Sequence, residues 1–407
     1  MLKKTKSVVK IRQIAPSTIL FELFLIMRWS HFITIIFCFQ LFLACINQNT
    51  PENLDEFCDQ TNQVSYAKGF CLIEKDNFTL LRLLDPNTGQ VKQEIALIPK
   101  SNAPRAGMAQ EQIIQVPISS IVATSTTHIP ALELIDQQGA LVGFPNLDYI
   151  SSAATRMLIA QDQVSELGQN EALNIEVLVS LKPELLMTFS IDQTQKGLEK
   201  VKQAGIPIIY NGDWTEEHPL GKAEWIKVFG ALFDKKAKAD SIFEQIKHNY
   251  LDLSALAKSA TKTPTVISGA LYKDIWYAPN GDSWAAKFLK DANSQYLWQD
   301  TKGTGSLQWS IEEIIQYINK AEFWIGPGQF TSYDQMAHSS AIYTKFEPYS
   351  NHKIYTFSNT KGPTGGLLYY ELASMHPDWV LSDLIHILHP GLLAADYVPK
   401  FFTPLTP

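Results

Sequence analysis

The sequence predicts an α/β fold with two lobes, each a mostly parallel sheet flanked by helices, joined by one long helix. Short apolar segments alternate with segments of helical periodicity from residue 112 onward, which predicts β-α units. A periodic segment over 236–260 contains neither Gly nor Pro, and a second alternating series follows it. A chain of 407 residues is long enough for two such lobes.

The N-terminal lobe is predicted over residues 64–235. Within it, residues 64–97 alternate short apolar runs with turns, and the segment DPNTG at 85–89 favours a tight turn. We therefore expect a small hairpin element there. The rest of the lobe is predicted to hold strands over 116–123, 140–144, 185–189 and 206–210, and helices over 128–136, 173–181, 193–204 and 220–233.

The linking helix is predicted over 236–260, where apolar residues recur near helical spacing and Pro264 follows the segment. The C-terminal lobe is predicted over 261–407. Its strands are expected over 265–270, 322–325 and 354–357, and its helices over 283–291, 311–318 and 367–388, with a break at His376-Pro377.

The N-terminus carries an export pattern. Phe32–Ala44 is an apolar run of 13 residues, too short for a membrane-spanning helix but typical of a signal-peptide core. The run ends directly before Cys45, which resembles a bacterial lipobox, although Phe42 stands where leucine is usual. We expect a signal peptide over 1–44 and lipidation of Cys45. The alternative is a buried N-terminal helix with an incidental cysteine.

The expected start and tether follow from the same pattern. Met27 begins a compact basic segment ahead of the apolar run and is an alternative true start. Residues 45–63 are largely polar and are predicted to be a lipid-anchored tether. The lipobox resemblance implies an exported, membrane-anchored lipoprotein that faces the periplasm or the cell exterior.

Charge excludes one class of partner. The whole chain has a formal net charge of −7. Residues 1–44 hold six of the 34 Lys/Arg and one of the 41 Asp/Glu, so the remainder has 28 bases, 40 acids and a net charge of −12. An acidic chain of this kind does not neutralise a phosphate backbone, so we expect no nucleic-acid binding.

Cysteine use leaves two alternatives. Cys38 lies in the predicted signal peptide and Cys45 is the predicted lipid attachment site, so Cys58 and Cys71 remain. In an exported protein they can form a disulfide or stay as two free thiols. Neither alternative indicates a metal site, which needs more ligands at regular spacing.

Several segments, in order along the chain, resemble one known family. They are IVATSTTH at 121–128, NIEVLVSLKPELL at 174–186, DWTEEHPLG at 213–221, and SIEEII at 310–315 ahead of AEFWI at 321–325. This set is similar to the solute-binding proteins of ABC transporters that have a helical backbone, the group that includes iron-siderophore, haem and cobalamin binders, and to its Bacteroidota-type lipoproteins. The resemblance covers about residues 110–390, and residues 46–110 have no counterpart in the smallest members.

The resemblance implies a function and a set of partners. It implies Rossmann-like lobes and the extracytoplasmic solute-binding component of an ABC importer, which captures a metal chelate between its lobes and delivers it to a permease dimer. The ligand would contain iron or cobalt. We expect a monomer with no intrinsic cofactor and no enzyme activity.

Candidate ligand-binding residues follow from the fold, because ligands of parallel α/β sheets lie beyond the carboxyl ends of the strands. Rigid aromatic side chains with a few polar groups suit a large planar or apolar chelate. The alternative for each aromatic residue is ordinary core packing. The predicted contacts are Thr127, His128, Asp148, Tyr149, Asp213 and Trp214 in the first lobe, and Tyr272, Trp276, Tyr277, Phe330, Tyr333, Tyr369 and Tyr370 in the second.

His128 has two functional interpretations. It can ligate a metal centre or donate to an anionic ligand at a helix N-terminus, where backbone N–H groups favour negative charge. Thr126 or Thr127 would then be the helix cap, which is the ordinary role of that position.

Two glutamates are predicted to dock on the permease. By the resemblance, Glu176 and Glu312 lie on equivalent helices of the two lobes and engage arginines of the permease dimer. The alternative is a solvated helix face, and Glu313 competes with Glu312 for the role.

Other functions have weaker support. A free-metal (Zn/Mn) receptor needs three or four converging ligands, and the predicted loops offer mainly His128 and Asp213. An enzyme or a surface interaction protein on the same scaffold is a further alternative, but the chain lacks H-E-x-x-H, G-x-S-x-G and G-x-x-x-x-G-K-[ST]. His386, His389 and Asp383 can hold an ion, although a structural role is expected.

Overall fold

The computed structural model describes residues 58, 62–85, 88–103, 113–189 and 196–407. The predicted signal peptide, the lipidation site Cys45 and most of the predicted tether lie outside the described residues. In the described part, the α/β architecture with mostly parallel sheets is confirmed.

The N-terminal lobe contains the predicted parallel sheet. Its strand order is β11-β10-β5-β6-β7, and all neighbouring pairs run parallel. Every residue of β5 and β10 is buried, because helices cover both faces of a parallel sheet and leave its strands apolar throughout. The strands are β5 (Ile121–Ala123), β6 (Leu141–Phe144), β7 (Ser165–Glu166), β10 (Leu185–Thr188) and β11 (Ile208–Tyr210).

Helices and short elements connect these strands. Side-chain caps begin three of the helices. Ser152 Oγ accepts from the Thr155 N–H at 3.1 Å, Asn174 Oδ1 accepts from the Val177 N–H at 3.2 Å, and His218 Nδ1 accepts from the Leu220 N–H at 3.0 Å. The helices are α3 (His128–Leu134), α4 (Ala153–Ala160), α5 (Ile175–Leu181), α6 (Lys196–Gln203), α7 (Pro219–Glu224) and α8 (Ile226–Leu232). The short elements are η2 (Gln138–Ala140), η3 (Leu147–Tyr149), η4 (Asp213–Thr215), β8 (Gly168–Gln169) and β9 (Ala172–Leu173).

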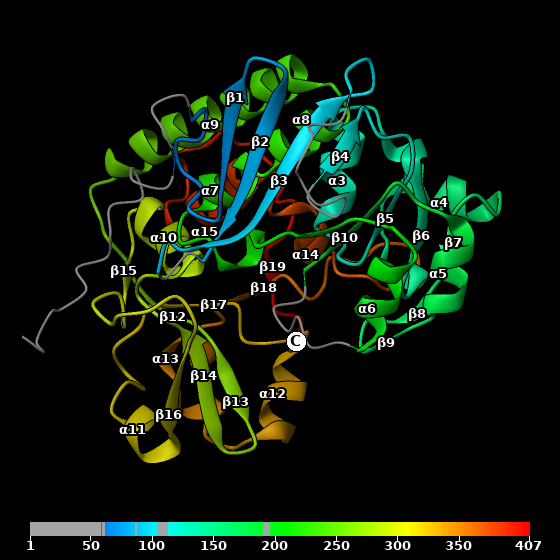
Figure 1. Ribbon diagram of the computed structural model, residues 1–407. Coiled ribbons are helices and arrows are strands. Elements are labelled where there is room, and N and C mark those ends of the chain that lie inside the picture. The colour runs from blue at the N-terminus through cyan, green and yellow to red at the C-terminus, as the bar shows by residue number, and fades with distance from the viewer. Residues whose placement is uncertain (1–57, 59–61, 86–87, 104–112, 190–195) are drawn as a thin grey trace, which may run out of the picture. The chain divides into compact units, whose positions relative to one another are not determined.

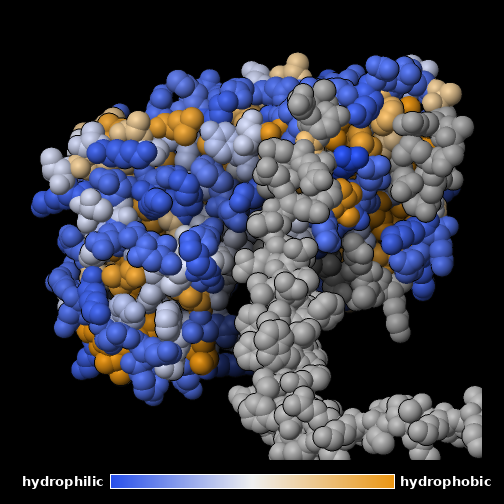
Figure 2. Space-filling view, turned by 60° about the vertical axis from the view of Figure 1, so that its left-hand side comes forward, coloured by the Kyte–Doolittle hydropathy of each residue, from blue (hydrophilic) through white to orange (hydrophobic). Residues whose placement is uncertain are grey.

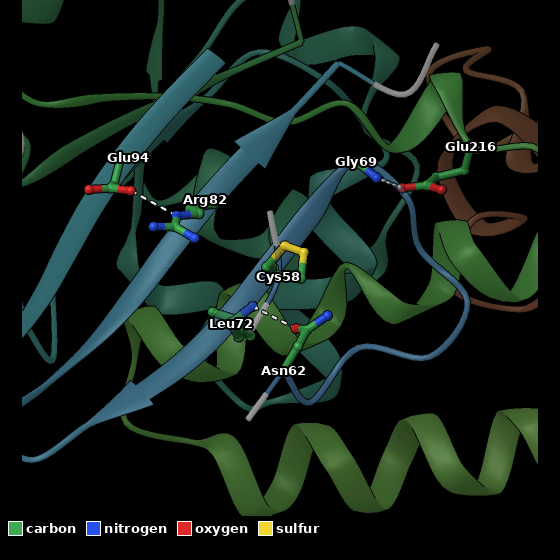
Figure 3. Close-up of a disulfide and its surroundings, with 8 residues drawn as sticks. Cys58, Asn62, Gly69, Leu72, Arg82, Glu94 and Glu216 are labelled. Atoms are coloured by element: carbon green, nitrogen blue, oxygen red, sulfur yellow. Dashed lines mark hydrogen bonds and ion pairs between the residues drawn. A yellow bond between two sulfur atoms is a disulfide. The ribbon is translucent and has the colours of Figure 1, made fainter. Parts of the chain in front are cut away.

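A separate four-stranded sheet precedes this lobe's parallel sheet. It comprises β1 (Phe70–Lys75), β2 (Phe78–Leu84), β3 (Val91–Pro99) and β4 (Ile113–Val116), in that order. It is larger than the predicted hairpin because β4 adds to β3 in parallel register. Cys58 and Cys71 form a disulfide, with Cα atoms 5.9 Å apart, that ties the preceding chain to β1 (Figure 3).

Two buried glutamates attach this sheet to the lobe. Glu216 accepts a hydrogen bond from the Trp225 Nε1–H at 2.9 Å. It also accepts the backbone N–H of Gly69 at 3.0 Å (Figure 3). Glu224 pairs with Lys227 at 2.9 Å. The two carboxylates together accept the backbone N–H groups of five consecutive residues: Ser65, Tyr66, Ala67, Lys68 and Gly69. The segment ahead of β1 is therefore an integral part of the lobe.

The linking helix is α9 (Lys236–Lys258), which is continuous over 23 residues. One face of it is buried through Ala239, Phe243, Ile246 and Tyr250, at the helical spacing that the sequence shows. It packs against α8 of the first lobe and against α15 (Pro377–Leu388) of the second. The Tyr250 hydroxyl donates to Asp291 at 2.8 Å, so this helix bonds directly to the C-terminal lobe.

The C-terminal lobe repeats the parallel sheet. Its order is β15-β12-β17-β18-β19, and only the β18–β19 pair is antiparallel. A small antiparallel sheet stands apart from it, beside α11 and α12 in Figure 1. The strands are β12 (Thr265–Ile267), β13 (Ala270–Tyr272), β14 (Ile275–Pro279), β15 (Gln295–Tyr296), β16 (Ser306–Ser310), β17 (Phe323–Ile325), β18 (Ile354–Thr356) and β19 (Thr403–Pro404). The helices are α10 (Trp284–Asp291), α11 (Ile311–Ile315), α12 (Tyr333–Ser339), η5 (Tyr343–Lys345), α13 (Glu347–Ser350), α14 (Leu368–Leu372) and α15.

Three predicted elements are divided in the structure. The strand predicted over 116–123 is β4 and β5 in different sheets, because Pro117 has no N–H to continue a ladder. The helix predicted over 220–233 is α7 and α8, which meet at Trp225. The strand predicted over 265–270 ends at Ile267, because Gly269 has a φ of +90° and a Cβ there would lie 2.0 Å from the Tyr277 carbonyl oxygen.

The cores hold most of the large apolar side chains. The largest cluster extends from the N-terminal sheet through α8 and α9 into the C-terminal lobe. On the face drawn in Figure 2, hydrophobic residues are scattered among a majority of hydrophilic ones. In the described part of the chain, no helix combines the length and apolar character that crossing a membrane requires.

Candidate ligand-binding site

A cavity of about 900 Å³ lies in the C-terminal lobe, beyond the carboxyl ends of β12, β17 and β18. Residues directly after each of these strands line it, which is where a parallel sheet leaves room between its loops. Helices α10, α14 and α15 and the β13–β14 hairpin close its sides. The lining consists of Ser268, Gly269, Ala270, Leu271, Tyr272, Tyr277, Pro279, Trp284, Ala285, Phe288, Leu289, Ile325, Gly326, Gly328, Gln329, Phe330, Phe357, Tyr369, Tyr370, Val380, Leu384 and Phe402.

Aromatic rings that hold one another in place form much of the wall. Phe357 and Tyr369 are stacked, with ring centroids 4.5 Å apart and planes at 16°. Trp284 lies 6.3 Å from Tyr369, and Phe402 packs edge-on against Tyr369 at 5.5 Å. Such contacts fix the rings in position, so the cavity presents a rigid, largely apolar surface.

The phenol hydroxyls are the main polar groups on this wall. Burial raises the pKa of Tyr369 far above its ordinary value, and burial also raises the pKa of Tyr370. Both hydroxyls therefore stay neutral at physiological pH and can donate or accept a hydrogen bond. The cavity can orient a ligand through neutral groups.

Five of the residues predicted in the second lobe line the cavity: Tyr272, Tyr277, Phe330, Tyr369 and Tyr370. Trp276 and Tyr333 differ from the expectation. Trp276 is fully buried, and its Nε1–H donates to the Ser268 carbonyl at 3.0 Å. It neighbours Tyr277 on β14, and alternate residues of a strand face opposite sides. Tyr333 is also buried, with its ring 5.1 Å from Tyr349, and packs away from the cavity.

None of the six residues predicted in the first lobe lines this cavity. His128 begins α3 and is fully buried, and burial lowers its pKa to about 4, so it is neutral. Neither of its ring nitrogens has a hydrogen-bond partner among the described residues. Asp213 is buried nearby and partly offsets that pKa shift. Thr127 precedes α3 but caps nothing with its side chain, which bonds to Ser125 Oγ at 2.9 Å.

The other first-lobe candidates are exposed. Tyr149 is 59% and Trp214 41% exposed, and the Asp148 side chain is 82% exposed. The backbone next to Tyr149 nevertheless touches the second lobe, because Thr364 Oγ1 donates to the Asp148 carbonyl at 2.7 Å. Whether these three side chains contact a ligand stays a prediction.

A buried carboxylate joins the two lobes beside these loops. Glu371 of α14 accepts hydrogen bonds from the Ser151 N–H at 2.6 Å and from the Ser152 N–H at 2.9 Å. Desolvation is the largest influence and raises the Glu371 pKa to about 7; the two N–H bonds act in the opposite direction, and Glu133 adds to the rise. The contact spans the lobes at the start of α4.

Sequence reasoning missed the helical part of the wall. Trp284 and Phe288 of α10 are one helical turn apart, and Val380 and Leu384 of α15 have the same spacing. This spacing marks one apolar face of each helix. From sequence alone, such a face indicates core packing as readily as a cavity wall.

The predicted docking glutamates lie at the starts of α5 and α11. Glu176 and Glu312 are both exposed. Glu313 is engaged instead in a capping box, where its carboxylate accepts the Ser310 N–H at 2.8 Å. Within the part of the chain that the structure describes, Glu312 is therefore the freer of the two carboxylates.

Two of the three residues considered for an ion site, Asp383, His386 and His389, have structural roles instead. Asp383 accepts backbone N–H groups of Lys400, Phe401 and Phe402, and His389 Nε2 bonds to the Ala292 carbonyl at 2.8 Å. Among the described residues, no group of three or more His, Cys, Asp or Glu can hold a metal ion.

Comparison with known proteins defines the class. Residues 121–360, more than half of the chain, match the periplasmic binding protein family, and the chain belongs to this family. It is similar to an uncharacterized lipoprotein of Methanocaldococcus jannaschii, with 25% identity over 289 residues that cover 69% of this chain and 67% of that lipoprotein. Members of the family bind a substrate and are not enzymes.

Two solved structures share the fold. One is described as a possible iron-binding (periplasmic solute-binding) protein of Staphylococcus epidermidis, with a TM-score of 0.54 and 18% identity over 67% of this chain and 99% of that chain. The other is the periplasmic heme binding protein HutB of Vibrio cholerae, with a TM-score of 0.53 and 13% identity over 67% of this chain and 100% of that chain. At these identities the likeness concerns the fold.

Proposed function

We propose that this protein is the extracytoplasmic solute-binding component of an ABC importer and captures a metal-chelate nutrient of the ferric siderophore, haem or cobalamin type. The aromatic cavity is the observation that carries the proposal. At about 900 Å³ it lies at the upper end of the roughly 300–1,000 Å³ typical of ligand pockets. The proteins of similar fold are described as iron-binding and heme binding, which supports a chelate ligand.

The predicted ligand contacts fall into two groups under this proposal. Tyr272, Tyr277, Phe330, Tyr369 and Tyr370 contact the ligand from the cavity wall. Thr127, His128, Asp148, Tyr149, Asp213 and Trp214 stay predicted contacts of the first lobe. The absence of a metal-binding group among the described residues favours a chelate, which carries its own metal ligands, over a free Zn or Mn ion.

Membrane attachment through Cys45 is part of the proposal. The relatives in Methanocaldococcus jannaschii include proteins named as lipoproteins, which supports the lipobox interpretation. A lipid at Cys45 would hold the protein next to its permease. Metabolic labelling with a radioactive fatty acid tests this: the chain should take up label, and Cys45→Ala should abolish it.

Docking on the permease is proposed for Glu176 and Glu312. Both carboxylates are exposed at helix starts of the two lobes, where they can pair with arginines and set the orientation of the complex. Reversal of both charges, Glu176→Lys with Glu312→Lys, should reduce uptake about tenfold or more in cells. The affinity for ligand should not change. The exposed Glu347→Lys and Glu322→Lys pair is the matched control.

The experiment that tests the binding function is tryptophan quenching with the purified chain. Trp284 lies in the cavity wall, so a bound chelate should quench its emission. The panel consists of iron porphyrin, corrinoids, ferric tris-hydroxamates and ferric tris-catecholates. At least one should bind without chemical conversion. Failure of all four classes, or turnover of any, would contradict the proposal.

A further inference from the structure

The charge of the cavity lining restricts the kind of chelate that it accepts. Not one of the 22 lining residues carries a formal charge. The polar side chains in the lining are Ser268, Gln329 and the four tyrosines, besides the indole N–H of Trp284. An ionised group moved into such a surface loses its hydration and gains no counter-charge. The described lining therefore disfavours a ligand that is charged in the part that the cavity encloses.

Three backbone groups of the lining residues are already paired within the protein. The carbonyl oxygens of Ser268 and Gly269 accept from the indole N–H groups of Trp276 and Trp324, both at 3.0 Å. The Leu271 N–H donates to the Tyr343 hydroxyl at 2.8 Å. The Leu271 N–H, which is the one donor among these three groups, is therefore not free to bind a carboxylate.

Two lysines approach the lining rings from outside. The Lys222 ammonium lies 4.2 Å from the Trp284 ring centroid. Burial lowers the pKa of Lys222, and the nearby carboxylates of Asp213 and Glu216 oppose that shift in part. Lys222 is not one of the lining residues, and these two carboxylates offset its charge. The Lys273 ammonium lies 5.2 Å from the ring of Tyr272, which is exposed at the hairpin, so that charge is in contact with solvent.

We infer that the cavity selects chelates that are uncharged in the part that the cavity encloses. It rejects chelates that carry ionised carboxylates or catecholates on that part. This inference rests on the proposed function and specifies its ligand class. Neutral donors and acceptors on the ligand, such as amides, suit the phenol hydroxyls of the wall. Rejection of the anionic analogue follows from the unpaired charge that it would bury.

Matched pairs of ligands test the inference with the purified chain. The pairs are a corrinoid with amide side chains and the same corrinoid with free carboxylates, a neutral ferric tris-hydroxamate and a trianionic ferric tris-catecholate, and iron porphyrin dimethyl ester and its diacid. In whichever pair binds, the neutral member should bind about tenfold tighter or more. Equal or tighter binding of the anionic member would overturn the inference and leave the proposed function standing. If no compound in any pair binds, the proposed function fails, and the inference fails with it.

A charge added to the wall provides the second test. Gln329 is an exposed lining residue, so Gln329→Lys should fold normally and place a cation beside the ligand. It should reduce the preference for the neutral member about threefold or more. Gln299→Lys, at an exposed position outside the lining, is the matched control and should leave the preference unchanged. An unchanged preference in Gln329→Lys would also contradict the inference.

Discussion

The two lobes have sheets of the same kind but different surroundings at the ends of their strands. In the N-terminal lobe the positions after β5 and β11 hold buried polar groups, His128 and Asp213, and exposed aromatic residues such as Trp214. In the C-terminal lobe the equivalent positions line an aromatic cavity. The added β13–β14 hairpin and the apolar faces of α10 and α15 make the difference. Similar parallel sheets therefore do not imply similar cavities at their strand ends.

Replacement of aromatic residues in the cavity should separate the two lobes most clearly, because it should cause the largest loss of ligand affinity. Tyr272 and Tyr370 line the cavity and are 63% and 50% exposed, so their joint replacement by alanine should leave the fold intact. Ligand affinity should fall by about 3 kcal/mol, roughly a hundredfold. The matched first-lobe pair, Tyr149→Ala with Trp214→Ala, should change it less than about threefold. Titration calorimetry measures both, and a larger loss in the first-lobe pair would reverse the assignment.

The disulfide gives a stability test that is confined to the N-terminal lobe. Cys58→Ser with Cys71→Ser opens a loop with a sequence separation of 13. The free energy of unfolding should fall by about 2–3 kcal/mol, because the unfolded chain regains conformational freedom. Urea unfolding with and without a reductant measures this loss. Ligand affinity should stay unchanged, since the disulfide is remote in sequence from every lining residue; a parallel loss of affinity would contradict the separation of the two roles.

The contact between the lobes should respond to pH through Glu371. Burial raises its pKa to about 7, above the value of about 4.3 expected in the unfolded chain. The folded protein thus holds this proton more tightly, and the stability that the proton contributes is full below about pH 4.3 and is lost as pH rises through about 7. Between pH 5 and pH 8, wild type should lose about 2–3 kcal/mol relative to Glu371→Gln.

The pH dependence due to Glu371 must be measured as a difference between wild type and Glu371→Gln, because other buried groups also titrate. Burial lowers the pKa values of His128, His218 and His376 to about 4, and these groups make stability rise with pH over the range where the unfolded histidines lose their protons. Because these histidines are present in both proteins, their contributions to the pH dependence of stability cancel in the difference. Urea unfolding of wild type, Glu371→Gln and the exposed control Glu322→Gln provides the comparison. A constant gap between wild type and Glu371→Gln across this range would show that the carboxyl is ionised throughout.

Much of the fold could be predicted because local patterns determine it. The α9 helix is present over almost all of the predicted range, and the parallel strands β10 and β17 lie where apolar runs predicted them. The small β13-β14-β16 sheet was not predicted. Its strands are short, and paired residues lie up to 35 positions apart in the chain, as Ile275 and Ser310 do. A local sequence pattern does not reveal pairing over such a distance.

The candidate site was predicted in part. Tyr369 and Tyr370 were chosen because they follow a strand-end loop, and they line the cavity. Trp276 does not line it, because one step along β14 reverses the direction of a side chain. Trp284 and Phe288 were missed because a buried helix face and a cavity wall have the same apolar composition. Only the space left between packed elements distinguishes them.

The sequence by itself determined the family, the alternation of strands and helices, and the expectation of an aromatic site at strand ends. Each of these depends on residues that are neighbours along the chain or one helical turn apart. The tertiary structure alone decided that the cavity is formed within the C-terminal lobe and that its described lining is uncharged. That result depends on which side chains from distant segments share one space, and packing rather than local pattern sets that arrangement.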